Sequence, residues 1–149
     1  VGIGDRIALN GACMTVTALD AARPAFTVEI SFDSLATTAG LSQTGPINLG
    51  QALRANDRLG GHLGSGHVDG VGTVTRFSQH GESWDLRLLT PKDLAKYLAY
   101  KGSLTVNGVS LTVNHVSDLP DGCECRGKRK VRRHGAGCCA LPAPASNDP

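Results

Sequence analysis

Aromatic residues and long apolar runs are both scarce in this sequence. Phe, Trp and Tyr make up 4% of its 149 residues, whereas hydrophobic residues as a whole make up 40%. Branched aliphatic side chains must therefore form most of any core, which favours short β-strands. No apolar run approaches the length of a membrane span, and no segment resembles the apolar part of a signal peptide. The length permits one ordinary domain or two small ones.

Cysteine and excess charge are nearly absent from residues 1–116. This part holds a single cysteine, Cys13, together with nine Lys or Arg and nine Asp or Glu residues. A lone cysteine argues against a disulfide framework and predicts a reducing, cytoplasmic location. Balanced charge gives this part of the chain no electrostatic basis for binding nucleic acid.

Two segments that lie 97 positions apart are versions of one another. Residues 4–17 read GDRIALNGACMTVT and residues 101–114 read KGSLTVNGVSLTVN. Each places an Asn-Gly pair between two apolar runs, which predicts a β-hairpin because both central residues of a two-residue turn need a positive φ. The matching order of apolar, small and Thr positions indicates common descent of two small domains.

The repeat also predicts how much of each domain is present. About 40 residues precede the second copy within its domain, whereas three precede the first, and the chain begins with Val. We therefore expect a fragment with the latter part of one domain (1–59), the front part of the next (60–116) and a segment of different character (117–149). The alternative is that the two homologous parts close together as one permuted barrel.

The pattern within residues 1–116 predicts an all-β fold. Short apolar or alternating runs, separated by turn signals, recur at 7–9, 14–18, 26–30, 47–49, 68–77, 84–89, 104–106 and 111–116. We expect one short helix, which opens at Thr90-Pro91 and ends before Gly102, since Thr can cap and Pro suits the first helical position. Many short strands favour small antiparallel barrels.

Residues 117–149 lose this pattern. They hold four of the five cysteines, a Lys/Arg cluster at 126–133 and a Pro/Ala-rich end. A frameshift explains this abrupt change best, and a solvated disordered tail is the plainer alternative. We predict no metal site, because the C-x-C and C-C spacings differ from the paired C-x₂-C of most zinc sites. The ligands of such a site would be Cys123, Cys125, His134, Cys138 and Cys139.

A glycine-rich segment, GGHLGSGHVDG at residues 60–70, is the second informative region. Its five glycines leave room for a flat ligand to lie against backbone amides. It matches neither a phosphate-binding loop nor the G-x-G-x-x-G and G-x-S-x-G motifs. His62 and His67 lack an H-E-x-x-H pattern, so we do not expect them to bind a metal as a pair.

Together these motifs resemble the riboflavin synthase family. GGHLGSGHVDGVG and YKGSLTVNGVSLTVN are similar to its second domain, and GDRIALNGACMTVT with FTVEISFDSLATTAG is similar to the latter part of its first. The resemblance implies two six-stranded Greek-key barrels, both incomplete here, and an active assembly of three chains. It also implies the conversion of two molecules of 6,7-dimethyl-8-ribityllumazine into riboflavin and 5-amino-6-(D-ribitylamino)uracil, with no cofactor. Association with lumazine synthase is a further implication.

The matching motifs imply the residues that contact the ligands. Those of the first barrel would be Cys13, Met14, Thr15, Glu29, Ile30, Ser31, Phe32, Asp33 and Ser34. Those of the second site would be Gly66, His67, Val68, Lys101, Ser110, Leu111 and Thr112. The catalytic candidates among them are His67, Cys13 and Ser110.

These residue types suit the chemistry. Two substrates held face to face gain proximity, and the conjugated lumazine is its own electron sink. Ser110 and Thr112 lie two positions apart, so their hydroxyls share one face of a strand, as Cys13 and Thr15 do. His67 is the candidate for proton transfer because imidazole titrates near neutrality. Cys13 as merely a small buried hydrophobe stays an open alternative.

Two other classes of function stay open. A non-catalytic lumazine or flavin carrier of the same fold would keep the residues that contact the ring system. A nucleic-acid binder would use the basic cluster and would lose affinity steeply with salt. Because incomplete barrels leave unpaired strand edges, we expect this fragment to be catalytically inactive.

Overall fold

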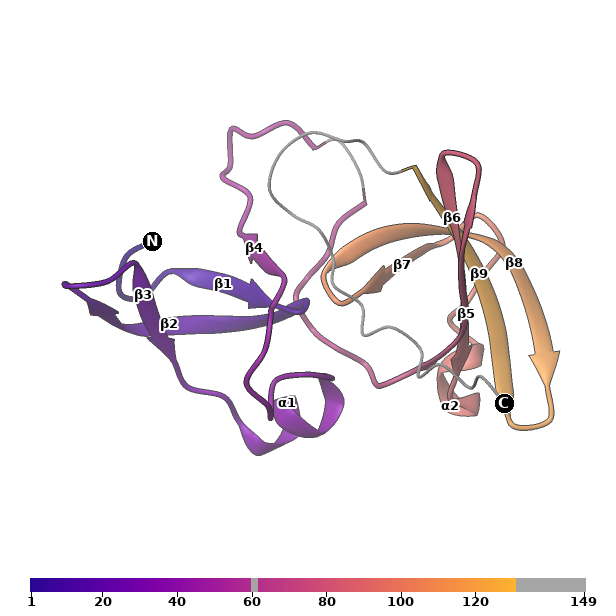
Figure 1. Ribbon diagram of the computed structural model, residues 1–149, viewed down its shortest axis with the longest axis horizontal. Coiled ribbons are helices and arrows are strands. Elements are labelled where there is room, and N and C mark those ends of the chain that lie inside the picture. The colour runs from indigo at the N-terminus through magenta and orange to yellow at the C-terminus, as the bar shows by residue number, and fades with distance from the viewer. Residues whose placement is uncertain (60–61, 131–149) are drawn as a thin grey trace. The chain divides into compact units, whose positions relative to one another are not determined.

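A computed structural model describes residues 1–59 and 62–130, which divide into two compact units (Figure 1). Unit 1 contains residues 1–69 and 105–109, and unit 2 contains residues 70–104 and those from 110 onward. Both units consist mainly of antiparallel strands, which confirms the all-β prediction. Among the described residues, neither helix has the length and apolar character that a bilayer crossing needs.

Unit 1 is built on a four-stranded sheet with the order β3-β2-β1-β4. Its strands are β1 (Arg6–Leu9), β2 (Ala12–Asp20), β3 (Ala25–Val28) and β4 (Leu49–Gln51), and helix α1 (Phe32–Thr37) follows β3. Asn10 and Gly11 join β1 to β2 with φ values of 49° and 93°. The predicted hairpin is therefore confirmed, with Leu9 opposite Ala12.

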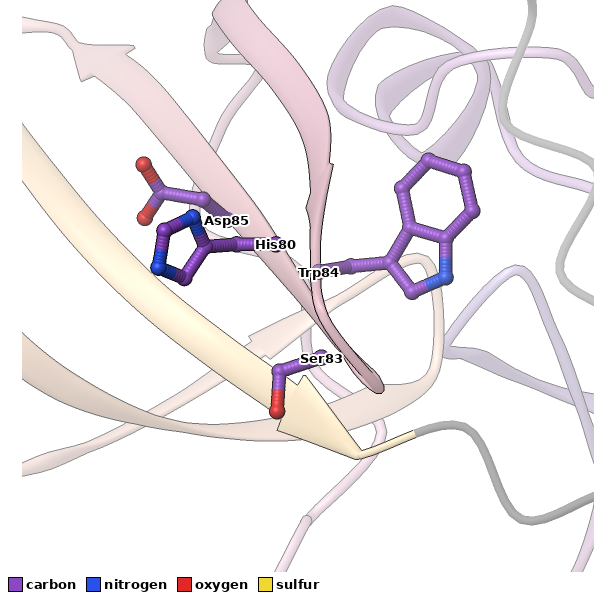
Figure 2. A pocket seen from close by; sticks show the side chains of 4 residues that line it. All are labelled: His80, Ser83, Trp84 and Asp85. Carbon is purple, nitrogen blue, oxygen red and sulfur yellow. The ribbon is translucent and has the colours of Figure 1, made fainter.

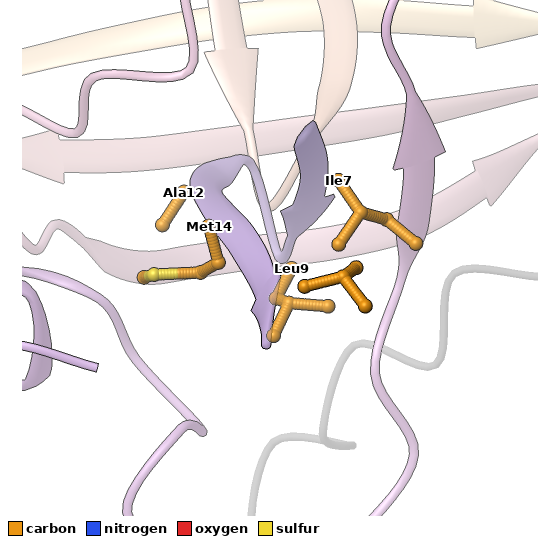
Figure 3. Close-up of a cluster of buried hydrophobic side chains, with 5 residues drawn as sticks. Ile7, Leu9, Ala12 and Met14 are labelled. Atoms are coloured by element: carbon orange, nitrogen blue, oxygen red, sulfur yellow. The ribbon is translucent and has the colours of Figure 1, made fainter. Parts of the chain in front are cut away.

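The core of unit 1 comes from one face of this hairpin. Alternate residues of β1 and β2 point inward, and Phe26, Val28, Ile30, Leu41 and Val68 pack against them. Figure 3 shows this cluster, whose buried members are Ile7, Leu9, Ala12, Met14 and Val16. Aliphatic side chains form most of it, as expected from the low aromatic content.

Unit 2 contributes most of a five-stranded sheet with the order β5-β6-β9-β8-β7 (Figure 1). The elements are β5 (Thr73–His80), β6 (Ser83–Thr90), α2 (Lys92–Ala95), β7 (Ser103–Val106), β8 (Val109–Leu119) and β9 (Gly122–Lys130). The turn between β7 and β8 belongs to unit 1 by its contacts. The buried apolar residues on the inner face of the sheet are Leu86, Leu88, Leu111, Val113, Cys123 and Cys125.

The two sequence repeats adopt the same backbone structure. Adding 97 to the first residues of β1, β2 and β3 gives the first residues of β7, β8 and β9. Asn107 and Gly108 have φ values of 48° and 81°, close to those of the first turn. The flanking hydrogen bonds also recur: Val16 O accepts from Gly4 N at 2.8 Å, and Val113 O accepts from Lys101 N at 2.7 Å. The two repeats are therefore alike down to individual backbone hydrogen bonds.

Two expectations about helices need correction. Helix α2 ends at Ala95, several residues before the predicted end, and helix α1 lies where no helix was expected. Ser31 explains α1, because its side chain accepts a hydrogen bond from Ser34 N and so caps the first turn. The expected strand at 68–77 begins only at Thr73.

The expected loss of structure at residue 117 is wrong for residues 117–130. β8 continues through Leu119 and β9 pairs along its length with β6 and β8. The reason is a period-2 pattern in β9, where Cys123 and Cys125 are buried while Glu124 and Arg126 lie on the other face. The predictions made for residues 131–149 lie outside the described residues, and so do His134, Cys138 and Cys139.

An ion pair on the other face joins β9 to β6. The Nε atom of Arg126 donates to Asp85 Oδ1, and Arg87 lies 3.8 Å from Asp85 Oδ2. Burial of Asp85 disfavours its charged form, but the hydrogen bond from Arg126 and the charges of Arg126, Arg87 and Arg76 outweigh this effect. The pKa of Asp85 consequently lies below its usual value of 3.8.

We predict that Asp85→Asn destabilises the protein at neutral pH by about 1–2 kcal/mol, a modest figure because Arg126 is partly exposed to screening solvent. A lowered folded-state pKa contributes stability above the unfolded-state value, and this stability is lost as the pH falls through the folded-state value. The free-energy difference between variant and parent should therefore shrink below about pH 3.8. Urea unfolding at several pH values measures it, with the exposed Asp121→Asn as control. A difference independent of pH would contradict the prediction.

Candidate functional site

Gly66 lies against Cys13 in unit 1. Cys13 N donates to Gly66 O at 2.8 Å, so the glycine-rich segment runs beside strand β2. Gly66 has a φ of 79°, and a Cβ at this position would overlap the Cβ of Cys13. Only glycine permits such a close approach at this backbone conformation. The close approach of Gly66 to Cys13 therefore depends on the absence of a side chain at position 66.

Consecutive residues of β2 point to opposite faces of the sheet. The three predicted ligand contacts on this strand, Cys13, Met14 and Thr15, therefore do not share one face. Met14 is 6% exposed and belongs to the core, whereas Cys13 is half-buried and Thr15 is exposed. Cys13 Sγ accepts a hydrogen bond from Arg6 Nε at 3.2 Å, so Cys13 is not simply a buried hydrophobe. Cys13 and Thr15 therefore share the face of β2 that points away from the core.

The segment Glu29–Ser34 leads from β3 into helix α1. Ser31 caps the helix and its hydroxyl also donates to Ser34 Oγ at 2.9 Å, which orders the first turn. Phe32 is 85% exposed, the highest value among the large hydrophobic residues in the described ranges. The Phe32 ring therefore makes no contribution to the core of unit 1.

Unit 2 holds the predicted contacts Lys101, Ser110, Leu111 and Thr112. Leu111 is buried in the core, whereas Ser110 and Thr112 are exposed on the opposite face of β8, as their spacing predicts. Lys101 has a φ of 63° where the first repeat has Gly4. Its Nζ donates to Asn114 Oδ1 at 3.3 Å and lies 5.2 Å from the centre of the Tyr100 ring. Left-handed backbone at a lysine costs about 1 kcal/mol or more and is often retained at functional sites.

The two histidines of the glycine-rich segment have different surroundings. His67 is exposed, whereas His62 is half-buried and its Nε2 lies 3.0 Å from Thr105 Oγ1. The expected second site groups Gly66, His67 and Val68 with residues of β8. By their contacts, however, these three residues belong to unit 1, where Gly66 adjoins Cys13. Because this contact joins residues 53 positions apart, no local sequence signal indicates it.

No group of three potential metal ligands occurs among the residues the structure describes. Cys123 and Cys125 are free thiols that lie in the core of unit 2. Burial raises the pKa of both thiols, and the charge of Asp118 adds to this effect at Cys123. Both side chains therefore act as small apolar core residues in this fold.

A small pocket in unit 2 contains none of the predicted contacts. His80, Ser83, Trp84 and Asp85 line it at the end of the β5–β6 hairpin (Figure 2). It encloses about 280 Å³ with open solvent included, which is less than most ligand sites enclose. The Trp84 ring instead stacks on Phe77, with 4.6 Å between ring centres.

Comparison with known proteins supports the resemblance drawn from the sequence. Residues 65–127 match the family model of the lumazine binding domain. The riboflavin synthase of Photobacterium leiognathi is 44% identical over 118 residues, and that of Schizosaccharomyces pombe is 44% identical over 119. These matches cover 78% and 77% of this chain. Over most of its length the chain is therefore similar to riboflavin synthases.

The chain spans about half the length of these riboflavin synthases, 53% and 56% in the two cases. Among solved structures, LumP in complex with 6,7-dimethyl-8-(1'-D-ribityl) lumazine is similar, with a TM-score of 0.69 and 22% identity. That match covers 85% of this chain and 67% of LumP. LumP in complex with riboflavin also has a TM-score of 0.69, at 20% identity. At these identities the likeness shows that the chain shares the fold of LumP and carries no further argument.

We predict that Gly66→Ala separates the glycine-rich segment from β2, because the new Cβ would overlap Cys13 and the left-handed φ would be strained. Amide exchange at Cys13 should accelerate by roughly tenfold or more, since its N–H donates to Gly66 O. Hydrogen exchange measured by NMR tests this. Gly64→Ala is the matched control, because nothing lies within 4 Å of its Cβ position. Equal exchange in both variants would contradict the prediction.

Proposed function

We propose that the protein acts as a riboflavin synthase and that this chain supplies residues that contact lumazine. In the proposed reaction two molecules of 6,7-dimethyl-8-ribityllumazine give riboflavin and 5-amino-6-(D-ribitylamino)uracil. The observation that carries the proposal is 44% identity to riboflavin synthases over most of the chain. The duplicated hairpins add support, because two like substrates need two like binding faces.

Residues 1–59 are proposed to be the latter part of one six-stranded lumazine-binding barrel, and residues 60–116 the front part of a second. Each would hold one lumazine on the face that carries alternate polar residues of its repeat. In the first repeat these are Cys13 and Thr15, and in the second they are Ser110 and Thr112. In the intact enzyme three chains would assemble in the cytoplasm, with lumazine synthase as a further partner.

The proposed chemistry starts with loss of a proton from the C7 methyl group of one lumazine. The resulting carbanion is stabilised by the conjugated ring and attacks the second lumazine. A four-carbon unit then passes to the acceptor, which becomes riboflavin, while the donor becomes the aminouracil. His67 would carry the proton, since it is exposed on the segment that also bears Gly66. Ser110, Cys13 and Lys101 would orient the ring oxygens and the ribityl chains.

A lumazine or flavin carrier is the second candidate. Its support is the fold shared with LumP, which has been solved with ribityllumazine, riboflavin and flavin mononucleotide. A carrier needs one ligand per binding face and no transfer between ligands. The enzyme and the carrier would therefore both bind lumazine, but only the enzyme would form riboflavin.

The test incubates the purified chain with 6,7-dimethyl-8-ribityllumazine and follows quenching of lumazine fluorescence and appearance of riboflavin separately. We expect saturable quenching. The lumazine affinity that it reports should fall roughly tenfold in the double variant Ser110→Ala/Thr112→Ala, since each hydroxyl contributes about one hydrogen bond. Thr73→Ala on β5 is the control, because it removes an exposed hydroxyl remote in sequence from the repeat.

Riboflavin formation that scales with chain concentration and falls about 100-fold or more in His67→Gln would support the enzyme and correct the expectation of an inactive fragment. Quenching without riboflavin would favour the carrier. Absence of both signals would contradict a lumazine function for this chain.

A further inference from the structure

Four basic residues form a row across the sheet of unit 2. Arg76 of β5 lies opposite Arg87 of β6, and Arg87 lies opposite Arg126 of β9. His115 of β8 continues the row, since it lies opposite Arg126. Directly opposed residues of an antiparallel pair share one face, so the four side chains occupy the same face of the sheet. With about 4.8 Å between neighbouring strands, the row spans roughly 14 Å.

The row lies on the face that points away from the core. Along β6, Arg87 alternates with Leu86 and Leu88, which are buried in the core. Figure 2 shows the side chains of Trp84 and Asp85 on opposite sides of β6. The stacked aromatic pair of this hairpin is therefore on the other face, and the row has charged neighbours instead.

The carboxylates beside the row are less accessible than its arginines. The side chains of Asp85 and Glu124 are 7% and 25% exposed. Those of Arg87 and Arg126 are 35% and 36% exposed, and Arg76 is exposed as well. Three arginines also outnumber these two carboxylates. This face therefore presents an excess of positive charge to solvent.

Arg87, at the centre of the row, is not held by short hydrogen bonds to these carboxylates. Its Nε atom is buried and has no hydrogen-bond partner among the described residues. Nε lies 3.8 Å from Asp85 Oδ2 and Nη1 lies 3.6 Å from Glu124 Oε1, distances longer than hydrogen bonds. Like charges that stand directly opposite one another destabilise a sheet. Because Arg76 and Arg126 flank Arg87 on both sides, an anion that bridges the three would relieve this repulsion.

We propose that this row binds the phosphodiester backbone of a single-stranded nucleic acid. Guanidinium groups bind phosphate through paired hydrogen bonds, and serine hydroxyls also contact phosphate oxygens. Ser117 adds such a hydroxyl beside the row, since its Oγ lies 2.7 Å from His115 Nε2. At about 3.4 Å or more per nucleotide, the row would contact three or four phosphates.

The shape of the row favours a single strand over a duplex. A flexible strand can follow a straight line of charges on an open sheet, whereas each backbone of a duplex winds away from it. Contacts to phosphates alone carry no sequence information, so binding should be independent of sequence. The proposal stands apart from the lumazine function, because none of the four basic residues is a proposed lumazine contact.

The experiment follows the fluorescence anisotropy of a labelled oligothymidylate as the full chain is added at several salt concentrations. We expect saturable binding whose log K falls by about 2 or more per tenfold rise in salt, since three arginine–phosphate contacts contribute about 0.7 each. The double variant Arg76→Gln/Arg87→Gln should bind roughly tenfold more weakly. Its salt slope should be smaller by about 1.4.

Single variants keep the test independent of any effect on folding. Arg76→Gln leaves the contacts of Asp85 with Arg87 and Arg126 in place, and it should reduce the slope by about 0.7. Arg76→Lys should keep the slope, because it keeps the charge. Arg58→Gln is the matched control, since it removes an exposed arginine from unit 1 and should change neither affinity nor slope.

Two further ligands test the choice of partner. A duplex of equal length and a poly-glutamate of equal charge should each bind at least severalfold more weakly than the oligothymidylate. Tighter binding of the duplex, or equal binding of poly-glutamate, would overturn the assignment to a single-stranded phosphodiester backbone. Absence of binding would overturn the proposal. An unchanged slope in both glutamine variants of the row would do the same, because any affinity would then arise elsewhere in the chain.

Discussion

The structure depends on a conformational constraint at two Asn-Gly turns. Asn10 and Gly11, and again Asn107 and Gly108, occupy the left-handed region that a tight hairpin turn requires. A turn of two residues fixes which residues of the flanking strands stand opposite one another. A shift by one position would turn Ile7, Leu9 and Met14 out of the core and bring Cys13 and Thr15 into it.

Asn10 extends this constraint beyond its own hairpin. Its side chain donates to Ala39 O at 3.1 Å and accepts from Asn48 N at 2.9 Å, so it ties the loop after α1 to the start of β4. Asn48 Nδ2 donates to Asn107 O at 2.9 Å, and a Cβ at Gly11 would lie 2.8 Å from Gly108 N. The two turns therefore contact one another through backbone within unit 1, where larger residues would not fit.

The candidate site follows from the same register. Because the turns set the strand faces, the polar pairs Cys13/Thr15 and Ser110/Thr112 occupy corresponding positions of two like sheets. The backbone is left-handed at Gly4 and at Lys101, but only the second repeat has a side chain at this position. Equal frameworks with unequal side chains suit the proposed reaction, in which two identical molecules would take different roles.

The sequence predicted the hairpins, the repeat and the all-β class, because Asn-Gly pairs and alternation act over a few residues. It did not predict helix α1, whose signal is a single capping serine, Ser31. Strand β9 was missed because its inward residues are Cys123 and Cys125, which suggested an aberrant segment more than a core. The Gly66–Cys13 and Asp85–Arg126 contacts join residues that are distant in sequence, so only the folded chain reveals them. The conformation of Lys101 was accessible by aligning it with Gly4.

The central claim is that both repeats present equivalent faces to a lumazine ring. An NMR titration of the chain with 6,7-dimethyl-8-ribityllumazine tests it most directly, because each amide reports separately. The account predicts saturable shift changes at residues 97 positions apart, Cys13 with Ser110 and Thr15 with Thr112. Changes absent from both pairs, or confined to the basic residues of β9, would contradict it.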